Sequence, residues 1–204
     1  MRLGLEGEIE VIVGDGSSDW KRIENALRRH ERDYCEVSVF FPKRGKEGKA
    51  RAQGTGIKGV FMFLRREIEF QPTNFVVFID REHVMGSRGR LGSEPEKRIV
   101  EAAQEFGIQA TVTELSEGVY RVCGKMGSKG FLVYFIFMGN CCVEDLVLRA
   151  CGKEVKEVEE PGCCKYYKEV LSSLPLDERE RCKAIAEDVL FQEFSKALDD
   201  FRKS

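Results

Sequence analysis

The chain has 204 residues, of which 42% are hydrophobic and 33% charged, and its formal net charge at pH 7 is −2. This length suits one α/β domain with a small extension, and the hydrophobic content excludes global disorder. Because the two signs of charge balance, a uniformly basic surface for nucleic acid is excluded, and any polyanion site has to be a local patch. The richness in charged side chains is typical of heat-adapted proteins.

No stretch of the sequence approaches 18 consecutive apolar residues, and charged residues run through positions 1–10. The sequence therefore predicts neither a transmembrane helix nor a signal peptide. We expect a cytoplasmic protein without a membrane partner. The oligomeric state stays open.

The first part of the chain has the pattern of a strand, a helix and a second strand. Residues 8–14 alternate and then become apolar, and a glycine turn leads to helical spacing of apolar residues over 19–32. Residues 35–41 are again typical of a strand. This order favours a right-handed parallel crossover.

A basic, glycine-rich segment, 42–58, follows and leads into a helix over 59–70. Such a segment is either a solvated surface loop or a site for phosphates. The run from Phe75 to Ile79 is continuously apolar, as in a strand buried on both faces of a parallel sheet. It ends at Asp80 and Glu82, which in an extended segment would point to the same side. Two such carboxylates suit a hard divalent cation, although a solvated acidic junction explains them equally well.

The second half predicts a helix over 95–106, short strands over 110–115 and 118–123, and a very apolar strand over 131–138. A helix over 143–150 carries Glu144 and Asp145, and a helical tail is broken at Leu174-Pro175. The whole indicates an α/β fold with a three-layer, mainly parallel central sheet and a C-terminal helical extension. We expect a domain over 1–150 and the extension, packed on it, over 151–204.

Acidic side chains follow each of the three most apolar strands. If these strands are neighbours, their carboxylates converge, and convergence of so many negative charges implies bound Mg²⁺ or Mn²⁺. The six candidate ligands are Asp15, Asp19, Asp80, Glu82, Glu144 and Asp145.

Eight cysteines are present, and five of them fall between 141 and 164. No CxxC pair occurs, so the spacing of a zinc ribbon is absent. Disulfides, buried thiols and a metal site remain three open explanations. Where a cross-link forms, we expect it between the 141–151 region and the pair at 163–164.

These motifs resemble the Toprim domain, especially that of the OLD (overcoming-lysogenization-defect) nucleases and of small stand-alone archaeal and bacterial relatives. The stretch Asp15-Gly16-Ser17-Ser18-Asp19 is similar to the first motif, Asp80-Arg81-Glu82 to the Asp-x-Asp motif, and Glu144-Asp145-Leu146 to a later helix start. The likeness covers roughly 8–150. Asp15 stands where the family has Glu, and Glu82 stands where it has Asp.

The resemblance implies a Toprim/Rossmann-like sheet and Mg²⁺-dependent phosphoryl transfer on nucleic acid, of nuclease type. It implies that Asp15 acts in acid/base transfer, and that Lys183 is the candidate for a downstream helical lysine. The basic side chains that would hold phosphates are Lys43, Arg44, Lys46, Lys49, Arg51, Arg88 and Arg90. A non-catalytic Toprim-like module with a degraded metal site, binding nucleic acid or a protein, is the alternative, and a small-molecule phosphatase or nucleotide enzyme is a third.

Overall fold

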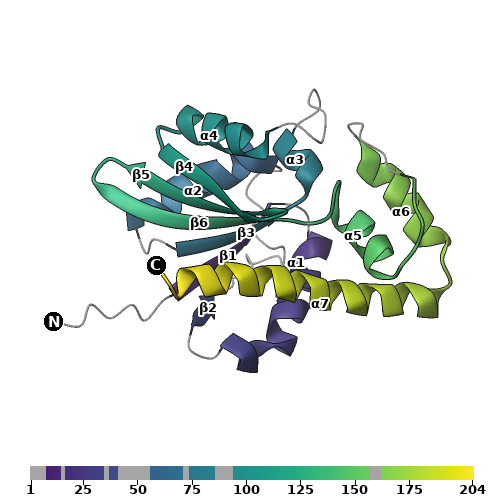
Figure 1. The fold of residues 1–204 in the computed structure, drawn as a ribbon. Helices are drawn as coiled ribbons and strands as arrows, with labels where there is room; N and C mark the ends of the chain where they lie inside the picture. Colours follow the sequence, from purple (N-terminus) through teal and green to yellow (C-terminus); the bar gives the residue numbers. More distant parts are fainter. Residues whose placement is uncertain are drawn as a thin grey trace.

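The computed structural model of the chain describes residues 8–14, 17–34, 37–40, 56–70, 74–85, 94–156 and 162–204. It is an α/β protein in which one mixed, mostly parallel sheet of six strands is flanked by helices (Figure 1). Within these residues, no helix combines the length and the apolar character needed to cross a membrane.

The sheet has the spatial order β2-β1-β3-β6-β5-β4. The neighbours from β2 to β6 pair in parallel, whereas β5 pairs antiparallel with both β6 and β4. The predicted parallel centre is thus extended on one side by an antiparallel meander. The strands are β1 (Glu8–Val13), β2 (Ser38–Phe40), β3 (Asn74–Ile79), β4 (Gln109–Ser116), β5 (Val119–Met126) and β6 (Lys129–Phe137).

The helices follow the predicted order, and the helix expected over 143–150 has those bounds. Leu174 ends one tail helix and Pro175 precedes the next, because proline lacks the N–H that a helix interior needs. The helices are α1 (Ser17–Arg29), α2 (Gly56–Phe70), α3 (Arg81–Met85), α4 (Pro95–Glu105), α5 (Val143–Ala150), α6 (Cys163–Ser173) and α7 (Leu176–Phe201), with a 3-10 turn, η1, at Glu31–Tyr34.

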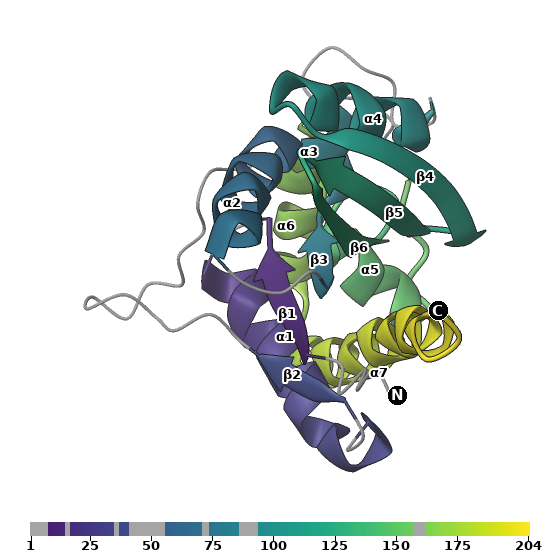
Figure 2. The ribbon, with the colours of Figure 1, turned by 90° about the vertical axis from the view of Figure 1, so that its left-hand side faces the viewer.

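Strand β3 is buried on both faces, as predicted from its unbroken apolar run. Phe75 and Val77 belong to a cluster shared with α2 and α4, whereas Val76 and Phe78 belong to a cluster shared with α1 and α7. Successive side chains of a strand alternate between faces, so one apolar run supplies both clusters. Figures 1 and 2 show α2 and α4 on one side of the sheet, and α1 and α7 on the other.

The meander is longer than its sequence predicts, because β5 continues through Gly124 to Met126. Gly124 lies opposite Phe131 of β6. A Cβ atom at Gly124 would be 2.0 Å from Cζ of Phe131, so the aromatic ring covers the glycine. A glycine that breaks the sequence pattern therefore makes room for a buried cross-strand side chain.

Candidate metal centre

The carboxyl ends of β1, β3 and β6 meet at one edge of the sheet, as predicted, because the three strands are parallel neighbours. Beyond the strands the pairing continues: Gly14 N–H donates to the carbonyl of Phe78 at 2.8 Å, and Met138 N–H donates to the carbonyl of Ile79 at 3.0 Å. Helices α3, α5 and α6 gather at this end (Figure 1). In open α/β sheets this is the edge where ligands bind.

Asp80 directly follows β3 and is 1% exposed. Its Oδ1 accepts a hydrogen bond of 2.9 Å from the backbone N–H of Val143, the first residue of α5. The N-cap residue of α5, Cys142, makes no side-chain capping bond, so the carboxylate of a neighbouring strand serves the start of this helix. The partial positive charge of a helix N-terminus stabilises the buried negative charge of Asp80.

Glu82 does not continue an extended segment, so the expectation that residues 80–82 are extended is wrong, and the reason for placing the two carboxylates on the same side no longer holds. Helix α3 begins at Arg81, and His83 N–H donates to the carbonyl of Asp80 at 3.0 Å. Side chains in a helix turn by about 100° per residue, so the alternation of a strand no longer holds. The backbone N–H of Glu82 donates to the carbonyl of Cys141 at 3.0 Å, which ties α3 to the loop after β6.

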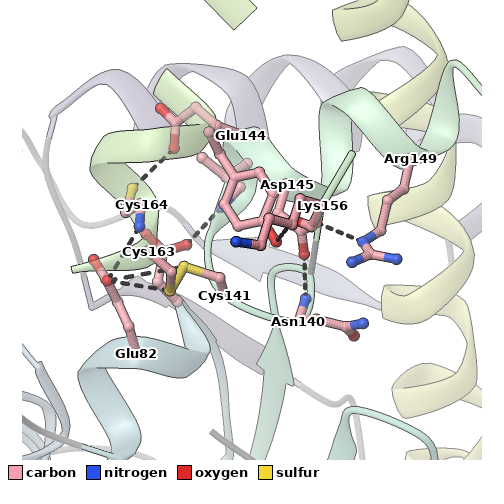
Figure 3. The surroundings of a disulfide bond; sticks show 12 residues. Glu82, Asn140, Cys141, Glu144, Asp145, Arg149, Lys156, Cys163 and Cys164 are labelled. Carbon is pink, nitrogen blue, oxygen red and sulfur yellow. Dashed lines mark hydrogen bonds and ion pairs between the residues drawn. A yellow bond between two sulfur atoms is a disulfide. The ribbon is translucent and has the colours of Figure 1, made fainter. Parts of the chain in front are cut away.

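The carboxylate of Glu82 lies against a disulfide between Cys141 and Cys163 (Figure 3). Its Oε2 is 3.8 Å from Sγ of Cys141 and 3.6 Å from Sγ of Cys163. These are contacts rather than hydrogen bonds, since disulfide sulfurs carry no proton. The same oxygen is 3.5 Å from the backbone N–H of Cys164. The predicted cross-link between the 141–151 region and the pair at 163–164 is confirmed.

Two buried thiols complete this edge. Sγ of Cys142, Sγ of Cys164 and a carboxylate oxygen of Asp80 all lie within 4.8 Å of one another. The thiol of Cys164 also donates to Oε2 of Glu144 at 3.3 Å (Figure 3). The hydrogen bond with Cys164 and burial raise the pKa of Cys142 above its ordinary value.

Asp145, by contrast, is fully buried and has both carboxylate oxygens engaged. Oδ2 accepts a 2.7 Å hydrogen bond from the backbone N–H of Asn140, and Oδ1 accepts one of 2.5 Å from Nε of Arg149 (Figure 3). The chain can turn back in this way because Gly139 has a φ of +80°. Asp145 thus fixes the loop between β6 and α5.

A pocket of about 460 Å³ opens beside these groups, and Glu82, Cys164, Lys165 and Lys168 are among the residues that line it. Burial lowers the pKa of Lys168, but the carboxylate of Glu144 and the side chain of Cys164 outweigh it, and the pKa is raised above its ordinary value. A cationic side chain therefore lies beside the acidic and sulfur-bearing groups, in the lining of the same pocket as Cys164.

For the other residues predicted from the sequence, the structure shows fewer contacts or does not describe the residue. Asp19 is buried in the first turn of α1, and it belongs to neither of the two described groups whose potential ligand atoms lie within 4.8 Å. Lys183 lies in α7 and forms an ion pair of 2.6 Å with Glu180 of the same helix. Outside the described residues lie Asp15, Lys43, Arg44, Lys46, Lys49, Arg51, Arg88 and Arg90.

Cys142, Cys164 and Lys168 were not selected from the sequence as site residues. The sequence did contain a signal, namely the two cysteine doublets at 141–142 and 163–164. Each doublet places two sulfur-bearing residues next to each other in the chain. The spacing of known zinc motifs does not cover this arrangement, because each doublet sits at the start of a different helix.

Comparison with protein-family models, with curated proteins and with solved structures found no match for this chain.

Proposed function

We propose that this chain catalyses divalent-metal-dependent phosphoryl transfer on nucleic acid, in the manner of a nuclease. The observation that carries the proposal is the buried Asp80 at the shared carboxyl edge of β1, β3 and β6. Acidic groups at such an edge are where α/β enzymes place the cations that act on phosphate. The resemblance of the three acidic motifs to Toprim domains supports the same reaction class.

We propose Asp80 as the first ligand of a divalent cation. Oε2 of Glu82 lies 3.5 Å from the backbone N–H of Cys164 and Oε2 of Glu144 lies 3.3 Å from its Sγ, and we propose both carboxylates as further donors. Hard oxygen donors of this kind fit Mg²⁺ or Mn²⁺, which would neutralise charge on the phosphoryl group and lower the pKa of a bound water. Asp145 is left out of the proposed set, because its two oxygens are engaged by Asn140 and Arg149.

The protein's own groups then orient the metal-binding carboxylates and neutralise charge on the phosphate. Val143 N–H fixes the carboxylate of Asp80, and Cys164 N–H lies beside that of Glu82. Lys168 faces the pocket, where its ammonium group can pair with a phosphate oxygen. Asp15 follows Gly14 at the end of β1, and we propose it as the acid/base group. For phosphate contacts beyond the pocket we retain the basic side chains named from the sequence.

A non-catalytic module of the same fold is the second candidate, and one observation favours it. The carboxylate of Glu82 rests on the Cys141–Cys163 disulfide, and Asp80 is almost completely covered. In this version the same edge would bind nucleic acid or a protein without turnover. Under either candidate we propose a three-layer, Toprim-like fold and a cytoplasmic location. A role for Lys183 is proposed too, and it rests on the resemblance to Toprim domains alone.

Cleavage of single- and double-stranded DNA and RNA, measured with Mg²⁺ and with Mn²⁺, tests the proposal. We expect the parent to cleave at least one of these substrates, and Asp80→Asn to reduce the rate by at least about 100-fold, because asparagine lacks the charge that a hard cation needs. Asparagine still accepts the hydrogen bond of Val143, so the fold should persist.

Asp177→Asn is the matched control, because this aspartate is exposed at the start of α7, and it should cleave like the parent. Cleavage that is equal in the parent and in Asp80→Asn would refute the enzyme. Salt-dependent binding without any cleavage by the parent would favour the non-catalytic module.

A further inference from the structure

The two cysteine doublets, 141–142 and 163–164, meet at the edge of the sheet. The first residue of one doublet lies near the first residue of the other, and the second lies near the second. The first members, Cys141 and Cys163, form the disulfide, and the second members, Cys142 and Cys164, remain thiols. Cys142 immediately precedes α5, and Cys164 lies in the first turn of α6. Both are buried, as is Asp80, whose carboxylate completes the group within 4.8 Å.

Two sulfurs and a carboxylate are the donors of a different cation from Mg²⁺. Mg²⁺ and Ca²⁺ bind oxygen almost exclusively, whereas Zn²⁺ accepts thiolate sulfur and carboxylate oxygen in a tetrahedron. With Zn–S distances of about 2.3 Å, the sulfurs of such a tetrahedron lie about 3.8 Å apart. The two sulfurs, already within 4.8 Å of each other, therefore need to approach by about 1 Å or less.

We propose that Cys142, Cys164 and Asp80 form a binding site for a thiophilic divalent cation, for which Zn²⁺ is the natural occupant. Glu144 is placed to supply the fourth ligand, because its Oε2 already contacts Sγ of Cys164 at 3.3 Å. A cation reaches the site through the pocket that Cys164 lines. The site has the ligand number, the donor chemistry and the access that a zinc centre requires.

Groups in the structure offset part of the charge that a bound cation would leave at this site. On binding, the thiols of Cys142 and Cys164 each lose a proton to solvent, and no electrons move, so the disulfide is unaffected. Two thiolates and two carboxylates then carry four negative charges against two on the cation. Lys168, beside Glu144 and Cys164, offsets one of the two that remain.

The inference concerns the thiols and does not rest on the proposed reaction. Since Asp80 belongs to both sets of ligands, a thiophilic cation at this site would withdraw it from Mg²⁺. This site is tested by sulfur coordination of the metal, whereas the proposed reaction is tested by cleavage, so the two proposals can fail separately.

Titration of the purified protein with Co²⁺, without reductant so that the disulfides stay intact, tests the proposal. Co²⁺ takes the same ligands as Zn²⁺ and gives a thiolate-to-metal charge-transfer band in the near ultraviolet. We expect one Co²⁺ per chain with this band, and loss of the band when Zn²⁺ is added. Cys142→Ser and Cys164→Ser should each weaken binding by at least about 10-fold to 100-fold, the loss that even a supporting group causes.

Cys123→Ser is the matched control, because Cys123 is an exposed free cysteine of β5, and it should keep the band. Zn²⁺ should also protect Cys142 and Cys164, but not Cys123, from alkylation mapped by mass spectrometry. Co²⁺ bound by the parent without a sulfur band would overturn the proposal, even if a serine variant fails to fold. Loss of the band in Cys123→Ser, or a Cys142–Cys164 disulfide in the purified protein, would overturn it equally.

Discussion

A variant in which Cys151 and Cys182 are both alanine is expected to lose about 3–4 kcal/mol of unfolding free energy. The disulfide between these residues joins the end of α5 to α7 across a sequence separation of 31. Removing the cross-link enlarges the unfolded ensemble, and the loss corresponds to a fall in melting temperature of about 10 °C for a chain of this size. Thermal unfolding followed by circular dichroism measures the shift.

Cys123→Ala controls for loss of a cysteine, and its melting temperature should stay within about 2 °C of the parent's. Because the loops closed by the two disulfides overlap along the chain, removing Cys141–Cys163 as well should add less than a second full increment. An unchanged melting temperature of the parent after full reduction would contradict a stabilising role for either cross-link.

Asp145→Ala is expected to lower the free energy of unfolding by about 3–5 kcal/mol, because it removes the buried acceptor of two hydrogen bonds to a charged group, worth about 1.5–3 kcal/mol each. The substitution leaves Arg149 without its carboxylate and the backbone N–H of Asn140 without its acceptor. Chemical unfolding in urea measures the change. Asp145→Asn should lose less, because its amide oxygen still serves one donor.

Glu144→Ala is the comparison within the same turn of α5, and it should lose no more than about 1 kcal/mol of unfolding free energy. Glu144 is half-buried, and its carboxylate accepts a hydrogen bond from the thiol of Cys164. Equal losses at the two positions would refute a structural role specific to Asp145. Folded Asp145→Asn should bind Mn²⁺ like the parent, whereas weakened binding would return Asp145 to the metal ligands suggested by the sequence.

The centre of the fold could be predicted because its strands carry unmistakable patterns. The runs over 75–79 and 131–137 are apolar at nearly every position, and only strands buried on both faces have that composition. That these strands are neighbours, and hence that their carboxyl ends meet, could only be assumed from the sequence, because β4 and β5 lie between β3 and β6 along the chain. The extent of β5 was harder to predict, since Gly124 is compatible with a strand only through the ring of Phe131.

The details of the site depend on contacts between distant segments. Nothing near Glu82 in the sequence predicts that α3 begins at Arg81, because the backbone N–H of Glu82 donates to the carbonyl of Cys141, which is distant along the chain. Asp145 belongs to an acidic cluster in the sequence, and only the turn at Gly139 brings its carboxylate onto Asn140. The cysteine doublets predicted a cross-link. Which cysteine of one doublet pairs with which of the other depends on how the starts of α5 and α6 are oriented toward each other.

We propose that Asp80 anchors a divalent cation at the carboxyl edge of the sheet. Titration of Mn²⁺ with protein, followed by the electron paramagnetic resonance signal of free Mn²⁺, measures this binding. We expect the parent and Asp177→Asn to remove the signal with about one ion per chain, and Asp80→Asn to bind at least about 10-fold more weakly, because it lacks the anionic ligand. Equal binding of Mn²⁺ by the parent and by Asp80→Asn, or no binding by the parent, would contradict it.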